Sequence, residues 1–198
     1  MTRKNPELKI TAEEALKRAD ILFARGDEAE AREYYRMVST GGRKNADVFF
    51  RYAVAIEDEK HEAAVKYYLQ ALKLDPAHAE ACYGAGRMYG RRGDLDKAIR
   101  YFRKAIKLNP KDAKSYCGVG LALSQKGKHW EALKNIKKAL SLEPEDSVDY
   151  HVYAMILENN GDLKGALKQY RHSAAIAKNL QVEYEIEKLK AMVEDEGG

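Results

Sequence analysis

The stretch from Ala79 to Pro110 reads AEACYGAGRMYGRRGDLDKAIRYFRKAIKLNP and carries the pattern that decides the fold. It contains two helical patterns, Ala79–Arg92 and Leu95–Leu108, separated only by a Gly-Asp pair. Gly93 suits the left-handed position that follows the end of a helix, and Asp94 can cap the start of the next one. Pro110 cannot continue the second helix. The stretch therefore predicts two helices joined by a tight turn.

Small and large residues alternate between these two helices in a way that indicates close packing. Gly86, Ala98 and Ala105 allow the helix backbones to approach, while Tyr89 and Phe102 fill the space around them. A single helix pair cannot bury its own apolar face, so it must stack on similar neighbours. The pattern therefore predicts a stacked array without a single central core.

The same pattern recurs along the chain. Three tripeptides, Leu74-Asp75-Pro76, Leu108-Asn109-Pro110 and Leu142-Glu143-Pro144, place their prolines 34 residues apart. An alanine lies 12 residues before each proline (Ala64, Ala98 and Ala132), and another lies 5 residues before it (Ala71, Ala105 and Ala139). A bulky residue lies 8 residues before each proline (Tyr68, Phe102 and Ile136). Without the proline, the pattern extends upstream through Ala19, Gly26 and Tyr35 and downstream through Ala154, Gly161 and Tyr170.

Five units follow from this spacing, at residues 12–45, 46–78, 79–112, 113–146 and 147–180. The second unit is one residue short, and its turn, Glu57-Asp58-Glu59-Lys60-His61, lacks the glycine. The 34-residue period, with small residues at positions 8, 20 and 27, an aromatic at 24 and proline at 32, resembles the tetratricopeptide repeat (TPR). The resemblance covers about residues 12–180. It implies an all-α fold, a right-handed superhelical array of antiparallel helix pairs (a TPR solenoid).

The two ends of the chain lie outside the repeats. Residues 1–11 are expected to form a flexible N-terminus. Residues 181–198 are expected to form a C-terminal solvating helix and a tail, because Val182, Ile186, Leu189 and Val193 share one helical face. Such a helix would cover the apolar face that the last repeat otherwise exposes.

Composition limits the class of protein. Charged residues make up 33% and hydrophobic residues 45% of the chain, as in folded proteins. No apolar run approaches the roughly 20 residues of a membrane helix, and Met1–Leu8 has no signal-peptide core. We therefore expect a cytoplasmic protein without a membrane partner. Cys82 and Cys117 lie in helical patterns and indicate neither a disulfide framework nor a metal site.

A search for catalytic motifs finds none. The chain lacks a phosphate-binding loop and a His-Glu-x-x-His zinc motif. Gly118-Val119-Gly120 is interpreted as a helix contact, since it lies within a repeat's first helix. The carboxylates of Glu57, Asp58 and Glu59 are interpreted as a solvated turn. We expect no catalytic residue, no cofactor and no metal, and a protein that is not an enzyme.

The resemblance also implies where a partner would bind. In TPR arrays the first helix of each repeat lines a concave groove, typically through positions 2, 5, 9 and 12. Transferred to this chain, those positions predict a groove of Leu16, Asp20, Phe23, Phe50, Val54, Tyr83, Arg87, Lys114, Leu121, His151 and Met155. Its apolar members could hold a peptide or an amphipathic helix. Alternatively, neighbouring helices or the final helix bury several of them. The expected function is that of a protein-interaction scaffold or adaptor.

One known TPR specificity is disfavoured. The carboxylate clamp that binds chaperone C-terminal tails requires a lysine and an asparagine where the first unit has Leu16 and Asp20. In the fourth unit Lys114 is suitably placed, but Gly118 replaces the required arginine. A chaperone tail is therefore not the expected partner.

Charge is distributed unevenly and suggests a second surface. Residues 79–140 contain 15 Lys and Arg against 5 Asp and Glu, whereas residues 141–198 contain 6 against 12. A basic run, Lys97, Arg100, Arg103, Lys104 and Lys107, follows one second helix, and Lys134, Lys137 and Lys138 follow the next. The run is either a solvated face, a patch for an acidic protein or nucleic acid, or a contact with the acidic part of another copy in a homo-oligomer. Few aromatics accompany it, which disfavours nucleic acid. Trp130 is either an exposed interface anchor or folded over its neighbour.

Overall fold

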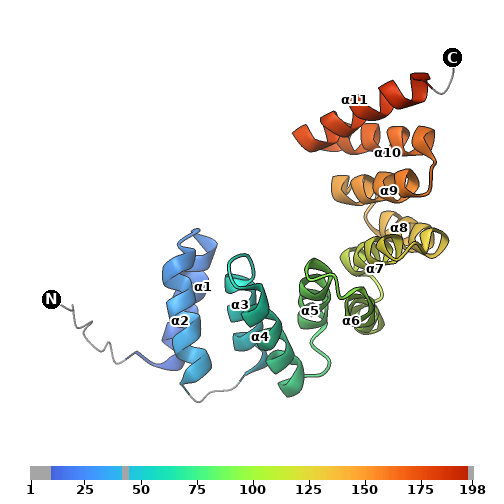
Figure 1. Cartoon of the computed structure of the whole chain (residues 1–198). Coiled ribbons are helices and arrows are strands. Elements are labelled where there is room, and N and C mark those ends of the chain that lie inside the picture. The colour runs from blue at the N-terminus through green and yellow to red at the C-terminus, as the bar shows by residue number, and fades with distance from the viewer. Residues whose placement is uncertain (1–9, 42–44, 196–198) are drawn as a thin grey trace. The chain divides into compact units, whose positions relative to one another are not determined.

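The computed structural model describes residues 10–41 and 45–195 (Figure 1). Over these ranges the chain forms eleven α-helices and no strand: α1 (Ala12–Ala24), α2 (Glu28–Thr40), α3 (Ala46–Ile56), α4 (His61–Leu74), α5 (Ala79–Arg91), α6 (Leu95–Leu108), α7 (Ala113–Gln125), α8 (His129–Leu142), α9 (Ser147–Asn159), α10 (Leu163–Ile176) and α11 (Leu180–Asp195). The predicted all-α fold of helix pairs closed by a final helix is confirmed. Of the N-terminus predicted to be flexible at residues 1–11, residues 1–9 lie outside the described residues, as do the last residues of the predicted tail, 196–198. Thr11 caps the start of α1.

The chain divides into two compact units, Met1–Gly84 and Ala85–Gly198, and the boundary falls within α5. Each helix pair contains a tight turn of the predicted kind. Four turn glycines, Gly26, Gly93, Gly127 and Gly161, have φ between +74° and +84°. Glycine adopts this left-handed conformation without the steric cost that a side chain would add. The turn after α3, residues 57–60, has no such glycine. There the Lys60 amide donates to the Ile56 carbonyl at 2.8 Å, and α4 begins at the next residue.

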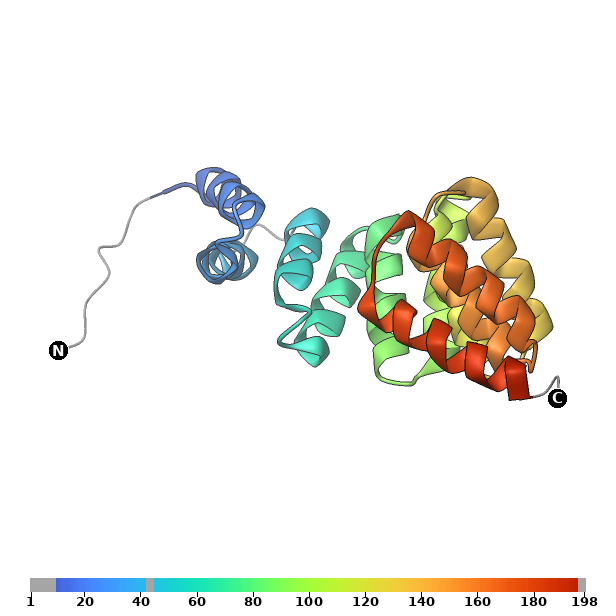
Figure 2. The ribbon, with the colours of Figure 1, turned by 90° about the horizontal axis from the view of Figure 1, so that it is seen from above.

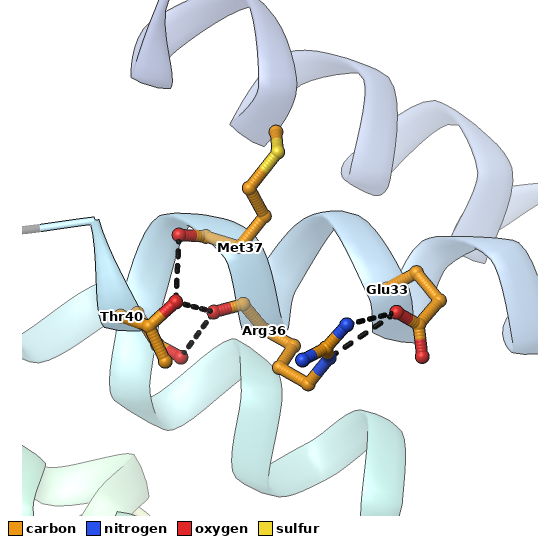
Figure 3. Close-up of polar contacts among 5 residues, drawn as sticks. Glu33, Arg36, Met37 and Thr40 are labelled. Carbon is orange, nitrogen blue, oxygen red and sulfur yellow. Dashed lines mark hydrogen bonds and ion pairs between the residues drawn. The ribbon is translucent and has the colours of Figure 1, made fainter. Parts of the chain in front are cut away.

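In the first unit, α1 packs on α2, α2 on α3, and α3 on α4. At the start of α1, Thr11 and Glu14 form a capping box in which each side chain bonds to the other residue's backbone amide. At the end of α2, the Thr40 hydroxyl donates to the carbonyls of Arg36 and Met37 at 3.0 and 3.2 Å (Figure 3). The capping box thus satisfies backbone amides that the start of α1 leaves without helical partners.

Arg36 also holds Glu33 on the outer surface of α2, with 2.7 Å between Nη2 and Oε2. Figure 3 shows the Met37 side chain pointing away from this ion pair. Both partners are exposed to solvent, and surface ion pairs of this kind contribute little to stability. Burial of the apolar face, rather than this pair, therefore positions α2.

Buried tyrosines connect the second helix of a pair to the first through hydrogen bonds. In three pairs, the tyrosine hydroxyl of the second helix donates to a carboxylate of the first: Tyr35 to Asp20 at 2.7 Å, Tyr68 to Glu57 at 2.6 Å, and Tyr170 to Glu158 at 3.0 Å. The interpretation of Glu57 as part of a solvated turn is wrong, since only 6% of this residue is exposed. The carboxylate turns inward because a tyrosine hydroxyl offers it a hydrogen bond there.

Replacing Tyr68 with phenylalanine is expected to lower the free energy of unfolding by about 2 kcal/mol, because hydrogen bonds to charged groups contribute about 1.5–3 kcal/mol. Urea unfolding followed by far-UV circular dichroism measures this. Tyr34→Phe, at a half-buried tyrosine of α2, serves as the control. An unchanged midpoint for Tyr68→Phe would show that the bond to Glu57 adds nothing to stability.

In the second unit, each helix from α6 to α11 packs on the next helix along the chain. The Phe102 ring on α6 fills the space between two glycines, since a Cβ atom on Gly86 or Gly118 would lie 2.8 or 2.6 Å from the ring. A Cβ atom on Gly120 would lie 3.3 Å from the Ala132 carbonyl oxygen of α8. The interpretation of Gly118-Val119-Gly120 as a helix contact is therefore confirmed.

Helix α11 closes the second unit by lying along α10 (Figures 1 and 2). Val182, Ile186 and Leu189 are buried against a cluster that includes Leu167 and Tyr170 of α10. These are three of the four residues predicted to form the apolar face, and Val193 is half-buried. Across the described residues, no helix is both long and apolar enough to cross a membrane.

Candidate functional site

A pocket of about 420 Å³ opens in the first unit. Its walls come from the first helices α1 and α3, from Tyr35 of α2, and from the start of α5. The lining residues are Asp20, Phe23, Ala24, Tyr35, Asp47, Phe50, Arg51, Val54, His78 and Glu80. This set combines apolar rings with several charged groups, as binding sites commonly do.

Aromatic rings form the apolar part of the pocket. Phe23 packs edge-on against Tyr35, with 6.4 Å between ring centroids. The Phe50 ring lies 4.8 Å from the His78 ring and 6.1 Å from the Tyr68 ring. Phe23, Phe50 and Val54 remain half-buried. The pocket therefore presents rigid apolar surface that is already held by neighbouring rings.

Asp20 contacts two other residues of the pocket lining, Tyr35 and Arg51. It accepts a hydrogen bond from the Tyr35 hydroxyl, and its Oδ1 lies 2.7 Å from Nη1 of Arg51. Burial raises the pKa of Tyr35, and the neighbouring Asp20 carboxylate raises it further. The tyrosine therefore stays protonated and donates to Asp20, whose charge Arg51 balances.

Two further carboxylates flank the buried side chain of His78. Asp47 lies 3.3 Å from Nε2 and Glu80 lies 3.2 Å from Nδ1, and both carboxylates are largely exposed. The Ala81 amide donates to Nδ1 at 3.3 Å. With Arg51 balancing Asp20, the carboxylates of Asp47 and Glu80 leave the rim of the pocket negative.

The structure brings together four of the groove residues predicted in this unit, namely Asp20, Phe23, Phe50 and Val54. Leu16 packs instead against the cluster of Ala15, Val38 and Val48, and Tyr83 is half-buried outside the pocket lining. Sequence reasoning did not select Tyr35, Arg51 or His78. Arg51 occupies position 6 of its repeat, a position that the carboxylate clamp uses, so its location could have been anticipated.

The remaining predicted groove residues belong to the second unit. Arg87 and Leu121 are half-buried and Lys114 is exposed. His151 packs edge-on against Tyr170 at 5.5 Å, and burial lowers its pKa. Met155 packs against the cluster that α11 completes, and Glu158 beside it lies 2.8 Å from Lys188 of α11. The final helix therefore covers part of the predicted groove at this end.

The predicted basic run lies on the outer side of α6. Lys97, Arg100, Arg103 and Lys107 are exposed, and Lys104 is half-buried. Lys97 and Arg100 lie over the rings of Tyr89 and Tyr101, each at 5.2 Å. Trp130 on α8 is 75% exposed. Helix α10 adds Lys164, Lys168 and Arg171, which sequence reasoning did not select, along a second pocket of about 460 Å³.

Neither unit shows a metal centre. No three His, Cys, Asp or Glu side chains come together as a possible metal site in residues 10–41 and 45–195. Cys82 and Cys117 are buried and are not joined to each other. The pocket of the first unit and the basic surface of the second unit both have the composition of binding sites.

Stacked helix pairs with left-handed turn glycines and a closing helix define a helical-repeat solenoid protein. Models of the tetratricopeptide repeat family match residues 53–113 and 101–134. Residues 53–134 therefore carry tetratricopeptide repeats.

Solved structures of TPR proteins share the fold. MamA from Desulfovibrio magneticus RS-1 superposes with a TM-score of 0.74 and 20% identity, covering 83% of this chain and 94% of that one. TTC0263 from Thermus thermophilus reaches 0.73 with 18% identity, covering 91% and 100%. YrrB, described as a TPR protein with an unusual peptide-binding site, reaches 0.70 with 17% identity, covering 92% and 94%. A comparison with curated protein sequences finds no match.

Proposed function

We propose that this chain is a scaffold or adaptor, built from five TPR units, that binds a partner protein through the pocket of its first unit. The observation that carries this proposal is the combination of half-buried rings at Phe23 and Phe50 with a negative rim. The likeness to YrrB, a TPR protein with a peptide-binding site, supports the same class of function.

The chemistry of the pocket defines the segment that would fit. A bulky aliphatic or aromatic side chain would fill the space between Phe23 and Phe50, where its burial gains about 25 cal/mol for each Å² of apolar surface. A lysine or arginine beside it would meet the exposed carboxylates of Asp47 and Glu80. An acidic segment would be repelled. The proposed ligand is therefore a peptide with an apolar anchor next to a basic residue.

Selection from a random peptide library on the intact chain is expected to enrich that combination. Phe50→Ala should raise the Kd of an enriched peptide at least about tenfold, because truncating an aromatic anchor costs about 2 kcal/mol or more. Asp47→Asn with Glu80→Gln should reduce the preference for lysine and arginine and the dependence of binding on salt. Isothermal titration calorimetry measures both effects.

Lys114→Ala is the matched control, since Lys114 occupies an equivalent groove position but lies exposed outside this pocket. Its affinity for the peptide should equal that of the parent chain. Thermal melts establish that each variant is folded. Enrichment of acidic peptides, or undiminished binding by folded Phe50→Ala, would refute the proposed site.

A further inference from the structure

Helix α8 exposes an aromatic residue within a field of positive charge. Trp130, Lys134 and Lys137 follow one another at i, i+4 and i+7 and therefore share one helical face, with Lys138 beside it. All four are exposed. Within the described chain no ion pair involves these lysines, whereas Glu131 is paired with Lys128 at 3.4 Å. We term Trp130, Lys134, Lys137 and Lys138 the basic face.

Helix α11 exposes the opposite combination. Leu180, Tyr184 and Glu187 also follow at i, i+4 and i+7, with Glu183 and Glu194 along the same side. Leu180 is 85% and Tyr184 is 64% exposed, values that mark them as large apolar groups in water. We term Leu180, Glu183, Tyr184, Glu187 and Glu194 the acidic face.

The acidic face cannot turn toward its own unit. The opposite side of α11 is buried on α10 through Val182, Ile186 and Leu189. Figures 1 and 2 show α11 as the last helix of the second unit, with no helix beyond it in the described chain. Within the second unit, Leu180 and Tyr184 therefore remain open to contact with another molecule.

We propose that two copies of this chain associate head to tail, with the basic face of one copy seated on the acidic face of another. Each face has an aromatic centre, and the net charges of the two faces are opposite in sign. On the acidic face Glu187 also pairs with Lys190, with 2.5 Å between Oε1 and Nζ, whereas no ion pair of the described chain involves Glu183 or Glu194. Aromatic anchors contribute most of the affinity at such contacts, and complementary charges orient them. This occupant covers all of the large apolar side chains of both faces at once.

A nucleic acid would match only the basic face and not the acidic face. Phosphates would match the lysines of α8 and the basic run on α6, but they would be repelled by Glu183, Glu187 and Glu194. They would also leave Leu180 and Tyr184 exposed. A second copy satisfies both faces, so it is the occupant that the charges favour.

The proposed contact joins two different surfaces, and each copy therefore keeps one face free. Such an interface adds further copies until the array closes into a ring or continues as a chain. Association should rise with concentration and weaken with salt, because exposed charges are screened over about 10 Å at 0.1 M ionic strength. It does not involve the pocket of the first unit.

Light scattering coupled to size-exclusion chromatography tests the proposal on the full chain. The average mass should increase with protein concentration. A basic-face variant, Trp130→Ala with Lys134→Gln and Lys137→Gln, and an acidic-face variant, Tyr184→Ala with Glu183→Gln and Glu187→Gln, should each remain monomeric. An equimolar mixture of the two should form a heterodimer that does not grow, since only one intact pair of faces remains.

Ile21→Ala with Lys17→Gln on α1 is the matched control, because it removes an exposed apolar and an exposed basic residue elsewhere. It should associate like the parent chain. A parent chain that stays monomeric at all concentrations would overturn the proposal. So would a mixture of the two variants that stays monomeric. Retention of a monomeric parent chain on duplex RNA, lost in the basic-face variant, would assign that face to nucleic acid instead.

Discussion

Gly84→Ala is expected to lower the free energy of unfolding by about 2 kcal/mol, although alanine normally stabilises a helix. The added methyl group would lie 2.5 Å from two ring atoms of Tyr68. That ring is fully buried, and its hydroxyl is held by Glu57 at 2.6 Å, so it has no room to retreat. Overpacking of this kind costs about 1–3 kcal/mol or more, which exceeds the gain of about 0.5–1 kcal/mol in helix propensity.

Gly90→Ala provides a control within the same helix. A methyl group there would meet only the Ala98 side chain, at 3.9 Å, which is an ordinary contact. It should therefore raise the free energy of unfolding by about 0.5–1 kcal/mol. Urea unfolding of the two variants should give shifts of opposite sign. Equal shifts would mean that Tyr68 does not require glycine opposite its ring.

Asp149→Asn is expected to stabilise the chain by up to about 3 kcal/mol at neutral pH, since one unit of pKa corresponds to about 1.36 kcal/mol. Asp149 is only 4% exposed, and burial raises its pKa from 3.8 to about 6, with Asp146 and Glu143 adding to the effect. A hydrogen bond with Cys117 acts in the opposite direction. Burial keeps the Cys117 thiol protonated by raising its pKa. Ionising this buried carboxyl is therefore costly.

The contribution of Asp149 to the free energy of unfolding falls as the pH rises. Below about pH 4, Asp149 is protonated in both the folded and the unfolded state, so its contribution to stability is fully present there. Between about pH 4 and 6, the folded state holds a proton that the unfolded state has released, so this contribution falls as the pH rises. Above the folded-state pKa of about 6, it is lost. Asparagine carries no such proton, so its advantage over the parent chain should grow across this window and then level off.

Chemical unfolding of both proteins from about pH 3.5 to about pH 8 measures the difference across this window. Cys117→Ala removes the thiol that donates to Asp149. The free energy of unfolding of this variant should therefore fall more steeply with rising pH than that of the parent chain. Glu30→Gln, at an exposed carboxylate of α2, should leave the pH dependence unchanged. A constant difference between Asp149→Asn and the parent chain would show that Asp149 ionises normally.

The sequence by itself determined the repeat, the helices and the closing helix. These features depend on local chemistry: glycines that adopt a left-handed turn, prolines that stop helices, and apolar residues at helical spacing. Helix α6 therefore has the predicted bounds, and α11 begins within one residue of the expected start. Gly118 and Gly120 could be assigned to helix contacts because they lie within the first helix of a repeat.

Only the tertiary structure decided which of the predicted groove residues form a site. Position within a repeat specifies the face of one helix, but burial depends on what packs against that face. Leu16 packs against the core of the first unit, and α11 covers Met155. Glu57 turned inward because Tyr68 lies opposite it, and His78 joined the pocket from a loop that the repeat pattern does not describe. These outcomes depend on contacts between distant segments, which no local pattern in the chain encodes.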